Sequence, residues 1–151
     1  MRPASLLKEA LRSGTVAAAA MIPAGLLFQR FGFDVGRYGP KVATLLVGGP
    51  PAPVVLLLLH FVIGWIFALP LLVALVRFPR LAAQPVGAGA AYGLSFYLGA
   101  NSLALPLFFG DPLPWLGGVR LVGPSLLIHL VYGISLGLTA RNFAARASPR
   151  A

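Results

Sequence analysis

The chain contains no cysteine and very few acidic residues, and both features narrow the classes of protein to which it can belong. Without cysteine there is no disulfide, thiolate metal site, cysteine nucleophile or cysteine-held iron–sulfur cluster. Only 3 Asp and Glu stand against 12 Lys and Arg, which gives a net charge of +9. Charged residues make up 10% of the 151 residues and hydrophobic ones 58%, with a mean hydropathy of +0.88. We therefore expect a membrane protein whose positive flanks face anionic lipid head groups, with no nucleic-acid partner.

Four apolar runs are long enough to cross a bilayer, which requires about 20 helical residues. They cover residues 14–33, 53–76, 85–109 and 121–140. None alternates like a porin strand, and a membrane favours helices because their backbone polar groups are satisfied internally. The sequence predicts an all-α membrane protein, a bundle of four transmembrane helices that forms a single domain over residues 1–151.

The first run has a second interpretation. Its basic preface, followed by an Ala-rich stretch, resembles a signal peptide. We favour a retained helix, because the apolar run continues past any A-x-A site to Phe28.

Positive charge is unequal between the two sides that four crossings define. One side holds Arg2, Lys8, Arg12, Arg77, Arg80, Arg141, Arg146 and Arg150. The other holds Arg30, Arg37, Lys41 and Arg120. Because cytoplasmic loops carry the excess of Lys and Arg, both termini are predicted in the cytoplasm, with the protein in a bacterial inner membrane.

The first and third loops then face the exterior. Within the first loop, Asp34 could cap a short interfacial helix that is ended by Gly48, Gly49 and the prolines after them. The third loop carries Trp115, and indoles favour the boundary with the head groups.

The only two histidines occur in similar surroundings. LLLHFVIGWIFAL at 57–69 matches LLIHLVYGISLGL at 126–138, and His60 and His129 are each followed four residues later by glycine, Gly64 and Gly133. This predicts an internal duplication of two helical hairpins, related by a pseudo-two-fold axis along the membrane normal. Both rings would then lie at one depth, roughly 10 to 12 Å below the external interface.

Packing alone accounts for these residues in the simpler interpretation. Small residues four apart let membrane helices approach closely, as Gly64 with Ala68, Gly89 with Gly93, and Gly133 with Gly137 would. Each histidine would then be a neutral imidazole, bonded to a backbone carbonyl, hydroxyl or water inside the bundle.

A b-type haem is the alternative interpretation. His60 and His129 would be axial ligands on opposite faces of the iron, and Gly64 and Gly133 would let the porphyrin lie close to the helices. Arg120, with Arg37 or Lys41, could meet the propionates.

A few uncharged polar residues lie inside the spans and could line a small cavity or bond between helices. They are Gln29, Ser95, Asn101, Ser102, Ser125 and Ser135. No Asp or Glu lies within the predicted spans, which argues against a carboxylate-based antiporter and against metalloprotease chemistry.

The layout resembles the small bacterial inner-membrane proteins of unknown function grouped with YagU, on LHFVIG at 59–64, IHLVYGISLG at 128–137 and the segment at Asp34. That resemblance implies four spans and no particular activity. Our first expectation is a non-enzymatic accessory or assembly subunit that contacts other membrane subunits, or its own copies, through small-residue helix faces. A haem-binding electron carrier is the second hypothesis, and a channel or transporter component is the third.

Overall fold

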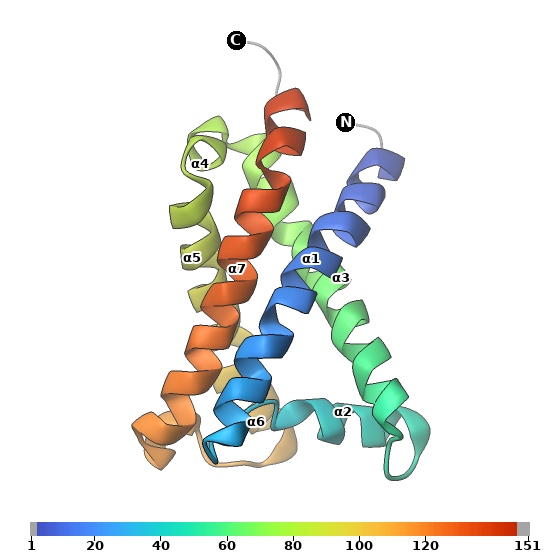
Figure 1. The fold of residues 1–151 in the computed structure, drawn as a ribbon, viewed down its shortest axis with the longest axis vertical. Coiled ribbons are helices and arrows are strands. Elements are labelled where there is room, and N and C mark those ends of the chain that lie inside the picture. Colours follow the sequence, from blue (N-terminus) through green and yellow to red (C-terminus); the bar gives the residue numbers. More distant parts are fainter. Residues whose placement is uncertain (1–2, 148–151) are drawn as a thin grey trace.

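The structure is a computed structural model that describes residues 3–147. All regular elements in this range are helical (Figure 1). The three long helices are α1 (Pro3–Arg30), α3 (Pro53–Arg77) and α7 (Val119–Ala147). The shorter α-helices are α2 (Tyr38–Val47), α4 (Pro79–Ala83), α5 (Pro85–Phe96) and α6 (Leu105–Phe109). The prediction of an all-α fold is confirmed.

Within the described range, three helices are long and apolar enough to cross a membrane. They are Pro3–Arg30, Pro53–Arg77 and Val119–Arg146, and they coincide with three of the four predicted spans. The remaining predicted span, 85–109, is helical throughout but divided, because a π-helix from Tyr97 to Ala104 separates α5 from α6.

Two long helices extend beyond their predicted bounds. The first begins at Pro3 instead of residue 14, because Ala10 and the polar Glu9 and Ser13 are also buried against the bundle. The last continues from 140 to Ala147, where Phe143 and Ala144 are buried. Helix α1 therefore includes one acidic residue, Glu9, which lies before the predicted span of 14–33.

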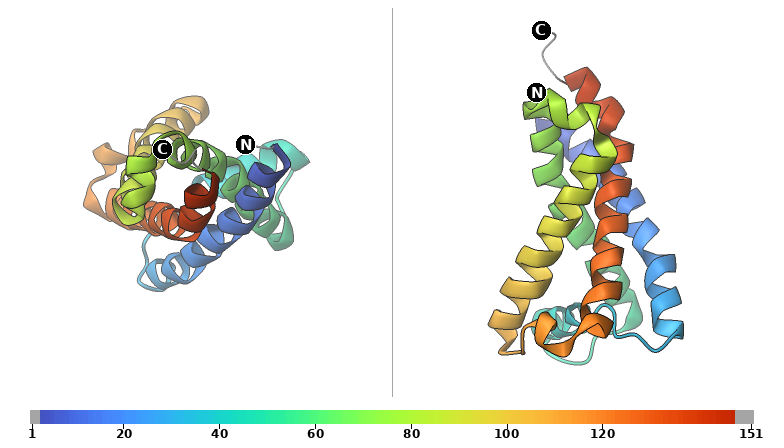
Figure 2. Two further views of the ribbon diagram at one scale, coloured as in Figure 1. Left: turned by 90° about the horizontal axis from the view of Figure 1, so that it is seen from above. Right: turned by 90° about the vertical axis from the view of Figure 1, so that its left-hand side faces the viewer.

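The two ends of the bundle differ. The start of α1, α4 and the end of α7 lie at one end, and α2 lies at the other (Figure 1). Arg2 and Arg150 fall outside the described residues. The helices converge toward the α4 end and spread toward the α2 end (Figure 2).

The buried core occupies the narrow end, where Leu71, Leu72 and Leu75 of α3 meet Leu136 and Phe143 of α7. The spread end has fewer buried side chains, which leaves room for a cavity.

Helices α5 and α7 touch through glycine. A Cβ added at Gly133 would lie 2.1 Å from the Gly89 carbonyl oxygen, and one added at Gly93 would lie 2.3 Å from the His129 carbonyl oxygen. Gly137 similarly faces the Pro85 carbonyl oxygen, at 2.2 Å from its added Cβ. Only glycine permits this backbone approach, so the prediction that these residues are helix contacts is confirmed.

Helices α1 and α3 make a similar, less tight contact. A Cβ added at Gly64 would lie 2.9 Å from the Ala18 Cβ, and one at Gly14 would lie 2.9 Å from the Gly64 carbonyl oxygen. Tyr132 of α7 donates its hydroxyl to that same Gly64 oxygen at 2.6 Å. Gly64 therefore joins α1, α3 and α7.

The π-helix has a local cause in Pro106. Proline lacks the N–H that would bond to the carbonyl of residue 102, and its ring crowds that carbonyl. The helical turns before Pro106 are therefore wider than in an α-helix, and the Leu105 N–H bonds to the Ala100 carbonyl five residues back. Asn101 and Ser102 lie in this widened segment, and π segments occur often at functional sites.

The short helix predicted in the first loop is present, but its predicted cap is wrong. Helix α2 begins at Tyr38 after Arg37, with no side-chain cap, and Asp34 is exposed and lies too far before it. Its end is as predicted, because Gly48 takes the left-handed conformation with φ 74° and donates its N–H to the Thr44 carbonyl.

Candidate functional site

The spread end of the bundle contains a cavity of about 270 Å³. Helix α1, the loop after it, α3, the π-helix and α7 all contribute to its wall. The lining residues are Met21, Ile22, Gly25, Leu26, Gln29, Val35, Gly36, His60, Asn101, Ser125, Ile128 and His129. Both histidines, the only ones in the chain, therefore line one space.

His60 is held by α1. Its Nε2 lies 2.9 Å from the Ala18 carbonyl oxygen, which connects the first turns of α3 to the middle of α1. A carbonyl oxygen can only accept, so Nε2 is the donor, and in a neutral imidazole Nδ1 is then the unprotonated nitrogen. The side chain is half-buried, with the Phe61 ring edge beside it.

His129 is held by its own helix and by two aromatic rings. Its Nδ1 donates to the Ser125 carbonyl oxygen at 2.7 Å, one turn earlier in α7. Phe96 and Tyr97 pack edge-on against the imidazole, with ring centroids 5.2 and 5.5 Å away. Nδ1 is therefore the donor, and in a neutral imidazole Nε2 is the unprotonated nitrogen. The prediction of neutral imidazoles bonded to backbone carbonyls matches both contacts.

The π-helix meets α7 through a polar contact beside His129. Asn101 donates its amide N–H to the Ser125 hydroxyl at 3.1 Å, so the prediction of a bond between helices is confirmed for this pair. A small adjoining pocket of about 20 Å³ includes Asn101 and Ser125 and extends to Asp34, Arg37 and Tyr38 at the α2 end. Polar groups thus continue from the cavity to the loops at the α2 end.

The residues expected around a haem are not all brought together. Gly64 and Gly133 face neighbouring helices, where they leave no space for a porphyrin. Arg120 is exposed, with its guanidinium 5.7 Å from the centre of the Phe33 ring. The His60 Nε2 is engaged by Ala18, so axial ligation through it would require this bond to break. Haem binding by the two histidines stays a prediction.

The two basic residues considered for the propionates bind a carboxylate instead. Lys41 of α2 lies 2.7 and 2.5 Å from the two Asp111 oxygens, and Arg37 lies 3.5 Å away. The Lys41 hydrogen bond lowers the pKa of Asp111 below its usual value, with the Arg37 charge adding to the effect. Burial raises the pKa of Tyr38, whose ring stacks on Phe109. This cluster fastens α2 across the end of α6.

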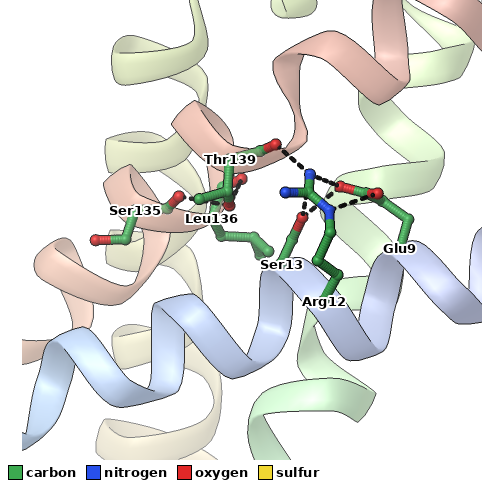
Figure 3. A network of polar contacts seen from close by, with 6 residues as sticks. All are labelled: Glu9, Arg12, Ser13, Ser135, Leu136 and Thr139. Carbon is green, nitrogen blue, oxygen red and sulfur yellow. Dashed lines mark hydrogen bonds and ion pairs between the residues drawn. The ribbon is translucent and has the colours of Figure 1, made fainter.

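A second polar cluster, at the narrow end, was missed from the sequence (Figure 3). Arg12 bonds to the buried Glu9 at 2.5 and 3.1 Å and reaches the Thr139 carbonyl oxygen of α7 at 2.7 Å. Ser13, fully buried, donates to Glu9. The opposite charges of Glu9 and Arg12, three residues apart, would indicate this cluster if the predicted helix began before residue 9.

This cluster is separate from the cavity. On α1 and α7 the fully buried Ala17 and Leu136 lie between the two sites. Arg12, whose side chain is half exposed, pairs with the buried Glu9 and ties α1 to α7 through the Thr139 carbonyl oxygen.

Fold and site together define an all-helical protein with three helices able to span a membrane and a two-histidine cavity between helices. No family model matches the chain, and no curated protein or solved structure matches it either.

Proposed function

We propose that the chain crosses the membrane four times, with 85–109 as the third crossing. At about 1.5 Å per residue this helical stretch is roughly 37 Å long, which exceeds the roughly 30 Å hydrocarbon core. Helix α4 precedes it at one end of the bundle, and the short 3₁₀-helix Pro114–Gly117 follows it at the other. This arrangement supports a crossing despite the π-helix.

The four spans would form two duplicated hairpins, α1 with α3 and α5–α6 with α7. The contacts support this view, because the glycine one turn after each histidine packs on a small-xxx-small pair of the preceding span. Gly64 meets Gly14 and Ala18, and Gly133 meets Gly89 and Gly93. A pseudo-two-fold axis along the membrane normal would relate the two pairs.

The proposed location is the inner membrane of a bacterium, with both termini in the cytoplasm. The end that carries α4 also carries Lys8, Arg77, Arg80, Arg141 and Arg146 on the described helices. The positive-inside tendency supports placing this end in the cytoplasm and the α2 end outside.

The observation that carries the functional proposal is a stripe of small residues on the outer face of α5 and the π-helix. Gly87, Ala91, Ser95 and Gly99 are all exposed and follow one another at intervals of four. The Ser95 hydroxyl bonds back to the Ala91 carbonyl, so the stripe presents no unpaired hydroxyl. We define these four residues as the α5 stripe.

The glycine faces that hold the bundle together are occupied internally. Gly64, Gly89, Gly93 and Gly133 are covered by neighbouring helices of the same chain, whereas nothing lies within 4 Å of a Cβ built at Gly99. In lipid, close approach between helices supplies much of the association energy. The α5 stripe is therefore a glycine-containing face that is left for another helix.

The proposed role is a non-enzymatic accessory or assembly subunit that docks beside a transmembrane helix of another subunit, or of its own copy. The YagU-like resemblance implies the same kind of small membrane protein without naming an activity.

Substitution in the α5 stripe tests this role. Ala91→Leu puts a bulky side chain in the middle of the stripe and should reduce a stoichiometric co-purifying partner about tenfold, the effect of a clash of 1–3 kcal/mol. Affinity purification in mild detergent with quantitative mass spectrometry measures the loss. Ala19→Leu, at an exposed alanine of α1, is the matched control and should retain the partner.

Two results would contradict the proposal. One is equal recovery of partner with both variants. The other is wild-type protein that repeatedly purifies alone as a monomer.

A further inference from the structure

Each histidine of the cavity has one ring nitrogen that makes no hydrogen bond to the described residues. The proton of His60 is on Nε2, bonded to Ala18, and the proton of His129 is on Nδ1, bonded to Ser125. Among the described residues, His60 Nδ1 and His129 Nε2 have no hydrogen-bond partner. Both are lone-pair acceptors, so a molecule that satisfies them has to donate hydrogen bonds.

The lack of charged side chains in the cavity wall argues against an ionic ligand. None of its lining residues is Asp, Glu, Lys or Arg. An ammonium or metal cation would lack a carboxylate, and among the described residues no three side chains suited to a metal gather. An anion would meet two acceptor nitrogens without a neutralising cation in the wall. The uncharged wall therefore suits a neutral molecule better than an ion.

The rest of the wall is apolar. Met21, Ile22, Leu26, Val35 and Ile128 surround the polar groups. Leu26 is 61% exposed on α1, a helix able to span the membrane, so the cavity edge lies beside the lipid-facing surface. A cavity of about 150 Å³ holds benzene, so 270 Å³ gives space for a substituted ring.

We propose that the cavity lined by both His60 and His129 binds a neutral, membrane-soluble compound of the quinol class. Its hydroxyls donate to His60 Nδ1 and His129 Nε2, and its ring packs against the apolar side chains of α1 and Ile128. Asn101 and Gln29 offer amide oxygens and N–H groups to further ring substituents. The proposal concerns binding, and it is independent of the α5 stripe.

Nitrogen NMR of the histidines tests the proposal directly, because the chain has only two. In detergent-solubilised protein labelled with ¹⁵N-histidine, His60 should show the Nε2–H tautomer and His129 the Nδ1–H tautomer. A short-chain ubiquinol analogue, kept reduced under anaerobic conditions, should shift the two unprotonated nitrogens in a saturable way. The corresponding quinone, which has acceptors only, is the matched control and should not.

Two kinds of variant complete the test. His60→Phe or His129→Phe should each weaken ubiquinol binding by up to about tenfold, the value of one hydrogen bond. Gly25→Leu adds a bulky side chain to the cavity wall and leaves both histidines in the chain, and a Cβ at Gly25 has room, since the nearest atom to it is Ile128 Cδ1 at 3.9 Å. It should abolish the ubiquinol shift while the tautomers of both histidines stay unchanged, which shows that the protein remains folded.

Three outcomes would overturn the assignment. Equal shifts with quinone would show that hydrogen-bond donation does not select the ligand. Saturation by Zn²⁺ at concentrations far below those of ubiquinol would make the cavity a metal site. Absence of any shift up to the solubility limit of the analogue would exclude quinols.

Discussion

At Gly133 the backbone of α5 lies so close to α7 that a single methyl group has no room. An alanine Cβ would lie 2.1 Å from the Gly89 carbonyl oxygen, which is rigid backbone. We expect Gly133→Ala to push the helices apart and to lower the free energy of unfolding by about 1–3 kcal/mol. Denaturant titration of the purified protein in detergent, followed by circular dichroism, measures the change.

Gly123 provides the control within the same helix. A Cβ there would meet only Val119 Cγ1, at 3.8 Å, which is an ordinary contact. Gly123→Ala should leave stability unchanged or raise it slightly, because alanine favours a helix more than glycine does. Equal destabilisation by both variants would refute the α5–α7 contact as the cause.

Residue roles could be predicted where the alternatives are few. A polar imidazole without a hydrogen-bond partner is costly in free energy inside a membrane bundle. The bonds of His60 and His129 to backbone carbonyls could therefore be predicted. Glu9 was missed because the polar residues around it resemble an exposed preface, whereas the burial of Glu9 and Ser13 and the contact of Arg12 with Thr139 show that this turn is packed. The contact of Arg120 with Phe33 could not be predicted, since a long side chain can reach several neighbours.

At the scale of elements, the cluster at Asp111 makes the position of α2 sensitive to pH. The Lys41 hydrogen bond holds the Asp111 pKa below its reference value of 3.8. A carboxylate with a lowered folded pKa stabilises the fold above its unfolded pKa, and this contribution is lost as pH falls through the folded value. We therefore expect α2 to separate from α6 as the pH falls below about 4.

Spin labels measure this release, because the chain has no native cysteine to interfere. Labels at Leu45→Cys and Leu116→Cys, which are 61% and 74% exposed, should give a narrow distance distribution at neutral pH and a broad one in acid. Asp111→Asn should broaden it at both pH values, whereas Asp34→Asn, an exposed acid before α2, should not. A narrow distribution for Asp111→Asn at neutral pH would contradict the prediction.

Helix centres could be predicted better than helix ends. Apolar length fixes α3 almost to the residue, because prolines and charges bound it on both sides. The ends of α1 and α7 extend further because burial against the neighbouring helices outweighs their polar composition. The π-helix was missed, since Pro106 signals a distortion without specifying its form.

At the scale of the whole molecule, the spread of the helices could not be predicted. Membrane helices are apolar all round, so their hydrophobic pattern does not show which face turns inward. Only the small residues mark contacts, and they fix the α5–α7 and α1–α3 pairs locally. The cavity depends on the divergence beyond these contacts, which no short motif encodes.

The number of crossings determines which loops share a side, and single cysteines can report it in a chain that has none. We expect Gly49→Cys and Val119→Cys to react with a membrane-impermeant maleimide on spheroplasts, and Ala83→Cys to react only after permeabilisation. If 85–109 did not cross, residues 83 and 119 would lie on the same side. Reaction of both positions, or of neither, would then replace the four-span arrangement with three spans. The unmodified chain, which cannot react with the maleimide, provides the blank for all three variants.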